Sequence, residues 1–167
     1  MSNPISDLVL GFQDLVSQVP ALVQPLIVDA AGAVPFIEGE GAAAIGIIGG
    51  LPPVVAALAG AVGNFLCVLV VVLLGARVRT AVLSRGGGAE DAAPSPRRAK
   101  VMRAYQRYGT PGVSLLGPLL VPTQITAAAL VSTGVPVRNV LFWQGAAIVL
   151  WTTAITLIIT GVIAFAA

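Results

Sequence analysis

Two carboxylates inside a long uncharged stretch constrain this chain more than any other feature. Glu38 and Glu40 are the only charged residues between positions 30 and 76. A carboxylate at bilayer depth costs about 2.5–3.5 kcal/mol on insertion scales, so a membrane protein that keeps two of them usually uses them. Pro35 and the glycines beside the pair predict a break in the helix at the same place, and such a break is tolerated only against protein or a water-filled cavity.

The composition places the whole chain, residues 1–167, in one small membrane domain. Hydrophobic residues make up 57% of the sequence and charged residues only 10%, and the mean hydropathy is +0.96. These values are far from those of a soluble domain. The chain has no histidine and one cysteine, Cys67. With no metal-ligand set and no nucleophile–base pair, we expect no metal, no cofactor, no enzymatic activity and no nucleic-acid partner.

Charge is sorted along the chain. Residues 1–76 carry five acidic residues and no base, whereas residues 77–107 carry eight basic residues and two acidic ones. The positive-inside rule therefore predicts that the basic loop 77–107 is cytoplasmic, in a multi-pass protein of the cell membrane. Within this loop the Gly- and Pro-containing stretch 84–96 is typical of a flexible linker. The bases could also hold anionic lipid headgroups, although setting the topology is a sufficient role for them.

The remaining sequence divides into helical segments. Residues 30–50 and 108–136 are each interrupted near their middle, by the acidic pair and by Pro118 and Pro122 respectively. Their arms are about half as long as a bilayer-spanning helix, so each segment reads as a re-entrant hairpin or as one kinked crossing helix. The expected elements are an amphipathic helix over 4–28, hairpins over 30–50 and 108–136, and transmembrane helices over 51–76 and 139–166.

The order of these segments suggests two related halves. Each half has an interfacial segment, an interrupted hairpin and an uncharged span, and the two spans run in opposite directions across the membrane. We therefore predict an all-α integral membrane fold with two inverted repeats, each a re-entrant helical hairpin followed by a transmembrane helix, plus the N-terminal amphipathic helix. Paired interruptions in two inverted halves are the best sequence indication of a transporter binding site.

Several short motifs resemble a known family. They are Glu38-Gly39-Glu40-Gly41-Ala42, Gly63-Asn64, Arg107-Tyr108-Gly109 and Gly117-Pro118-Leu119-Leu120-Val121-Pro122-Thr123. Over roughly residues 30–165 the chain resembles the small multidrug export family, which is related to the DedA/VTT superfamily of membrane transporters. The resemblance implies proton-coupled transport with an acidic residue in the first hairpin, a role that falls on Glu38.

The sequence also departs from that family. Glu40 stands where the family pattern, which is similar to Glu-x-Arg-Gly, has an arginine. Arginines that the DedA proteins carry in the second hairpin are absent here, around Pro118 and Gln124. These departures argue against recognition of a phosphate headgroup.

A candidate site follows from the hairpins. Two poorly solvated carboxylates two positions apart titrate as a coupled pair. We expect them to bind protons and a cationic or amphiphilic substrate alternately while the hairpins move against each other, with polar contacts from the second hairpin and the first span. The candidate residues are Glu38, Glu40, Asn64, Thr123, Gln124 and Thr126. In the structural alternative, the glutamates only cap the second arm and Asn64 only packs between helices.

The sequence therefore predicts a proton-coupled exporter of small cationic or amphiphilic compounds. Membrane lipids surround it, protons and a small-molecule or lipid substrate are its ligands, and a homodimer is expected because one protomer offers little surface to enclose a pathway. Two alternatives stay open. One is a DedA-like flippase or scramblase for a polyprenyl phosphate or a phospholipid, in which positive helix ends accept the phosphate. The other is a membrane scaffold that transports nothing.

Overall fold

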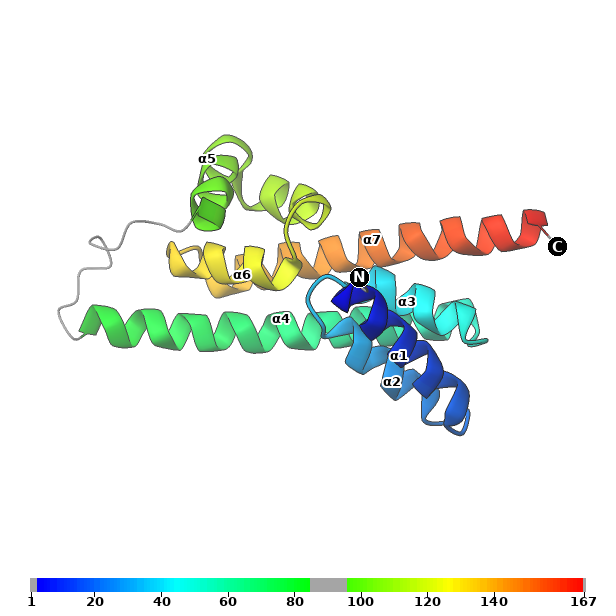
Figure 1. The fold of residues 1–167 in the computed structure, drawn as a ribbon. Helices are drawn as coiled ribbons and strands as arrows, with labels where there is room; N and C mark the ends of the chain where they lie inside the picture. Colours follow the sequence, from blue (N-terminus) through cyan, green and yellow to red (C-terminus); the bar gives the residue numbers. More distant parts are fainter. Residues whose placement is uncertain (1–2, 85–95, 167) are drawn as a thin grey trace. The chain divides into compact units, whose positions relative to one another are not determined.

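A computed structural model describes residues 3–84 and 96–166, and every regular element within these residues is a helix. This confirms the all-α prediction. Figure 1 shows the elements in chain order. They are α1 (Pro4–Gln18), α2 (Gln24–Gly32), α3 (Glu38–Ile48), α4 (Pro53–Ser84), α5 (Pro96–Leu116), the short 3-10 helix η1 (Gly117–Leu119), α6 (Thr123–Ser132) and α7 (Val137–Ala166).

The chain forms two compact units. Unit 1 comprises Met1–Leu66 and Ile148–Ala167, and unit 2 comprises Cys67–Ala147. The division falls inside α4 and inside α7, so each long helix contributes one part to each unit. The units are described separately below.

Helices α4 and α7 are long and apolar enough to cross a membrane. They have 32 and 30 residues, and their most apolar windows have mean hydropathies of 2.6 and 2.3. At 1.5 Å per residue they are about 48 and 45 Å long, which exceeds the hydrocarbon core of about 30 Å. Only 28% and 17% of those windows is buried within the protein, unlike the core helices of soluble proteins. The two helices cover most of the segments 51–76 and 139–166, over which the sequence predicts transmembrane helices.

The first span and the basic loop differ from the prediction. Helix α4 continues to Ser84 instead of ending at residue 76, because no glycine or proline interrupts residues 76–84. Much of the predicted loop 77–107 is therefore helical, in α4 and in α5. Most of the predicted linker, residues 85–95, lies outside the described residues.

The single amphipathic helix predicted over 4–28 is wrong. The structure has two helices there, α1 and α2, separated around Pro20. Val19 is extended (φ −103°, ψ 155°), as expected for a residue whose α conformation is disfavoured by the following proline. Pro25 lies in the first turn of α2, where the missing N–H costs nothing. The two prolines thus have different effects: one ends a helix and the other helps to begin one.

The first hairpin is also displaced from its predicted position over 30–50. Its arms are α2 and α3, so it begins at Gln24, and the break falls at residues 33–37 rather than at the glutamates. Pro35 lies in this connection, and the next residue, Phe36, adopts a left-handed backbone conformation (φ 73°). Glu38 and Glu40 therefore belong to the first turn of α3.

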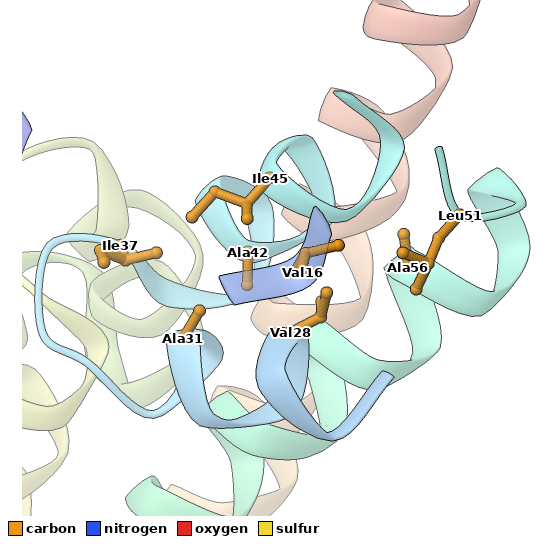
Figure 2. Close-up of a cluster of buried hydrophobic side chains, with 8 residues drawn as sticks. All are labelled: Val16, Val28, Ala31, Ile37, Ala42, Ile45, Leu51 and Ala56. Carbon is orange, nitrogen blue, oxygen red and sulfur yellow. The ribbon is translucent and has the colours of Figure 1, made fainter. Parts of the chain in front are cut away.

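Small apolar side chains form the core of unit 1. Helices α1, α2 and α3 pack on one another, and the start of α4 closes the cluster (Figure 2). The buried members are Val16, Val28, Ala31, Ile37, Ala42, Ile45, Leu51 and Ala56. Three of the eight are alanines, so the helix axes must approach closely to fill the space between them.

Two glycines of α4 permit this close approach. A methyl group at Gly63 would collide with the backbone carbonyl of Asp29 in α2. A Cβ atom at Gly60 would lie 2.6 Å from the carbonyl oxygen of Gly39 in α3. One turn of α4 thus lies directly against the backbones of both hairpin arms, as small residues allow.

Unit 2 contains the second interrupted segment. Helix α5 kinks at Gly109 (φ 66°, ψ −173°), where it leaves the helical conformation, and η1 then leads to α6. Helix α6 begins at Thr123, directly after Pro122, where the sequence predicts an interruption. Its end is closed by Gly134 (φ 96°), against which the guanidinium group of Arg79 lies. A cation at a helix C-terminus interacts favourably with the helix dipole.

We predict that Gly63→Ala destabilises the protein strongly, by about 1–3 kcal/mol or more, because backbone atoms cannot yield to the added methyl group. Gly161→Ala is the matched control: it lies in α7 with nothing within 4 Å of the added methyl group. The Gly161→Ala variant should be as stable as the wild type or slightly more stable, because alanine favours the helix. Thermal unfolding in detergent, followed by circular dichroism, measures both. Equal melting temperatures for the two variants would contradict the close contact between α2 and α4.

Candidate functional site

The six predicted site residues fall into two groups of three. Glu38, Glu40 and Asn64 belong to unit 1, and the three residues of α6 belong to unit 2. All except Glu40, which is half-buried, are buried; Glu38, for example, is only 4% exposed. Burying a polar or charged group is unfavourable unless it has partners, so this pattern indicates groups that have partners or a function. That the two groups meet remains a prediction.

The acidic pair lies at the N-terminus of α3. Glu38 and Glu40 occupy its first turn, and the capping position is taken by Ile37, whose side chain makes no capping bond. Carboxylates are favourable in this position because the helix dipole places partial positive charge there. In the structural alternative, the glutamates themselves cap this arm. The structure differs in one respect, because both glutamates lie inside the helix rather than before it.

The backbone around the pair is unusual. Phe36 (φ 73°) and Glu38 (φ 55°) are the non-glycine residues with left-handed backbone conformations in the described chain. Such conformations cost roughly 1–3 kcal/mol each and persist only where the surroundings enforce them. They are concentrated at functional sites, which makes the connection from α2 to α3 the best local candidate in unit 1.

Two buried groups of unit 1 lie close to this connection. The space beside Gly39, between the two glutamates in sequence, is occupied by the hydroxyl group of Thr152 in α7 and by the backbone of Gly60 and Ala61 in α4. A Cβ atom at Gly32, the last residue of α2, would lie 3.2 Å from the backbone nitrogen of Asn64. The predicted residue Asn64 is thus beside the first arm of the hairpin, and Thr152 is beside the second.

The threonines of α7 were not among the predicted site residues. Thr152 and Thr156 are buried, and neither hydroxyl group has a hydrogen-bond partner within the described chain. A helical threonine normally donates to a preceding carbonyl, as Thr160 of the same helix does to Thr156 O at 2.8 Å. A signal was present in the sequence: Gln144, Thr152 and Thr156 recur at multiples of four, which places them on one face of an otherwise apolar helix.

Unit 2 holds a second group of buried polar residues. Thr123, Gln124 and Thr126 begin α6, and the Thr126 hydroxyl lies 3.3 Å from where Gly117 would carry a Cβ atom. Ser114, one turn before Gly117, is also fully buried. Pro122 takes the capping position of α6, no side chain makes the cap bond, and Thr123 is the first residue of the helix.

The residues described here offer no group of three or more His, Cys, Asp or Glu side chains that could hold a metal ion. The chemistry available at the first hairpin is therefore that of carboxylates, hydroxyl groups and an amide. These groups can exchange protons and accept hydrogen bonds from a cation.

No protein-family model, curated protein or solved structure matches this chain. The resemblance to the small multidrug export family therefore remains a prediction.

We predict that Gly39→Ala destabilises the protein and that Thr152→Ala partly relieves this effect. The added methyl group would occupy the place of the Thr152 hydroxyl, and removing that hydroxyl makes room for it. In a double-mutant cycle measured by thermal unfolding, the coupling between the two changes should reach about 0.5–3 kcal/mol, the range for residues in contact. The double variant should melt above the temperature expected if the two effects simply added. Strict additivity would contradict the contact between α3 and α7.

Proposed function

We propose that this protein is a membrane transporter that couples proton movement to the export of small cationic or amphiphilic compounds. The buried carboxylate of Glu38 at the start of α3 is the observation that carries this proposal. Ionisable residues inside membrane segments are rare and mark ion or substrate pathways. The two long apolar helices support a membrane location. Under this proposal the basic stretch from Arg77 to Arg107 lies on the cytoplasmic side of the cell membrane, an orientation that the positive-inside rule supports.

The two interrupted helix pairs support transport rather than a purely structural role. Helices α2 and α3 form one pair, and α5 with η1 and α6 forms the other. In secondary transporters, helix N-termini at corresponding positions of the two repeats typically direct their partial positive charge at the binding site. Under this proposal both pairs are re-entrant hairpins of an inverted repeat. A homodimer would provide the additional surface needed to enclose a transport pathway.

The acidic pair supplies a simple coupling mechanism. Glu38 and Glu40 are two positions apart at the start of α3, so the charge on each affects protonation of the other. A cationic substrate stabilises the ionised pair and displaces a proton, and a proton displaces the substrate in turn. Because the site binds either the proton or the substrate but not both, the two cross the membrane in opposite directions. The buried amide of Asn64 is in the same unit and can contribute a polar contact.

We predict that Glu38→Gln abolishes substrate-driven proton movement in reconstituted vesicles and that Glu40→Gln reduces it at least about tenfold. Glutamine preserves the size of each side chain and removes the titrating group. Asp14→Asn is the matched control, because Asp14 is an exposed carboxylate on α1 and should not affect transport. A pH-sensitive dye trapped in the vesicles measures the flux.

Unchanged flux in both glutamate variants would overturn the proposal. Transport of a labelled phospholipid, with no dependence on a proton gradient, would favour the flippase reading instead. A scaffold would be favoured if both variants fold like the wild type and none of the proteins transports protons or phospholipid.

A further inference from the structure

We propose that the C-terminal part of α4 holds a binding site for anionic phospholipid headgroups, in which Arg77 recognises the phosphate. The inference rests on the membrane location in the proposed function and is independent of transport. It begins with charge. Between residues 67 and 147 the only acidic residues are Glu90 and Asp91, and both lie outside the described residues. The described part of unit 2 therefore carries basic side chains and no carboxylate that could neutralise them.

Arg77 lies where α4 reaches the end of a hydrocarbon core. The helix is uncharged from Pro53 to Ala76, and Arg77 is its first charged residue. At 1.5 Å per residue the uncharged part is about 36 Å long, slightly more than the core thickness of about 30 Å. When this part spans the core, the exposed guanidinium group of Arg77 lies at the depth of the phosphates of one leaflet.

A hollow in the protein surface lies beside this arginine. It is open, has a volume of about 390 Å³ and is lined by Ala76, Arg77, Thr80 and Ala81. The Thr80 hydroxyl donates to the carbonyl of Ala76 in its own helix at 3.0 Å. The hollow thus combines one guanidinium group with small and mostly apolar walls. A lipid whose phosphate pairs with Arg77 can place its glycerol and the start of an acyl chain against the two alanines.

The neighbouring arginine is engaged differently. The guanidinium group of Arg79 lies against Gly134 at the C-terminal end of α6, where a cation interacts favourably with the helix dipole. The guanidinium group of Arg77 has no hydrogen bond or ion pair with another described residue. Arg138, exposed in the first turn of α7, adds positive potential to the same unit. Of the two arginines in this turn of α4, Arg77 is therefore the one available to an external anion.

The chemistry of the guanidinium group defines the ligand. Its planar fork can donate two parallel charge-assisted hydrogen bonds to a phosphate. Every phospholipid has a phosphate, but phosphatidylcholine also carries a quaternary ammonium group that the surrounding bases repel. Phosphatidylglycerol has the same phosphate and no cation. Bases next to a transmembrane helix attract anionic lipids for this reason.

The test compares dioleoyl-phosphatidylglycerol with dioleoyl-phosphatidylcholine, which have the same acyl chains. Each lipid is titrated into the purified protein in detergent, and native mass spectrometry counts the bound molecules. We expect wild type to bind phosphatidylglycerol at least about fivefold more tightly, the effect of one basic side chain near a membrane surface. Arg77→Gln should remove most of this preference. Inorganic phosphate, added at constant ionic strength, should not displace the lipid, because it makes no contact with the apolar walls.

Three further variants separate the hollow from diffuse charge. Arg107→Gln removes the same charge from an exposed position of α5 outside the hollow, and should lower the affinity for phosphatidylglycerol less than about twofold. Ala81→Leu fills the hollow without changing the charge, and should weaken binding about as much as Arg77→Gln does. Ala164→Leu is its matched control, because it adds the same atoms at an exposed position of α7 and should change nothing.

The outcomes separate this inference from the proposed function. Equal binding of the two lipids by wild type, equal losses in Arg77→Gln and Arg107→Gln, or full binding by Ala81→Leu would overturn the inference. Displacement of the lipid by inorganic phosphate would assign the site to free phosphate groups and overturn the lipid as its ligand. Binding of phosphatidylglycerol that depends on Arg77, in a protein without proton flux in vesicles, would support this site and overturn the coupled transport.

Discussion

The packing of two hairpin arms against a single turn of α4 is the interaction on which unit 1 depends. The turn is formed by Gly60 and Gly63, and the backbones of Gly39 and Asp29 lie where side chains would otherwise stand. In a membrane there is little hydrophobic driving force between helices, so close van der Waals contact between backbones supplies much of the association. This contact also fixes the start of α3, and with it the position of the acidic pair.

Close packing has a consequence for the polar groups. Because α3, α4 and α7 approach through small residues, the few polar side chains on their inner faces are sealed from solvent. Glu38, Asn64 and Thr152 are all buried in this way within unit 1. Burying an apolar residue at any of these positions would cost less free energy than burying these polar side chains. The transport site proposed above is placed here because these polar groups are buried around the first hairpin.

The charge of the described chain is divided between the two units. All of its acidic residues are in unit 1, and all of its arginines are in unit 2, from Arg77 to Arg138. Neither unit can therefore neutralise its charges internally with residues of the described chain. Within the described residues the acidic side chains all precede position 66 and the arginines all follow it. Under the proposed function, the basic part of the chain would orient the protein in a membrane.

The sequence by itself determined the helical class, the two long apolar helices and the division of the second interrupted segment. These features follow from hydropathy and from proline chemistry, which act locally: Pro122 cannot continue a helix, and α6 begins directly after it. The sequence also indicated the acidic pair, because charge is so rare around it. It misplaced the first break by a few residues: the break lies at 33–37, around Pro35, and the glycines beside the glutamates lie inside α3.

Only the tertiary structure decided which polar groups lie together. Gly39, Gly60 and Thr152 are far apart in the chain, and nothing in their local sequence pairs them. Thr152 looks like one of several threonines in an apolar helix, and it can approach α3 closely only because Gly39 has no side chain. Contacts of this kind depend on how surfaces fit across helices, and local propensity and hydropathy carry no information about that fit.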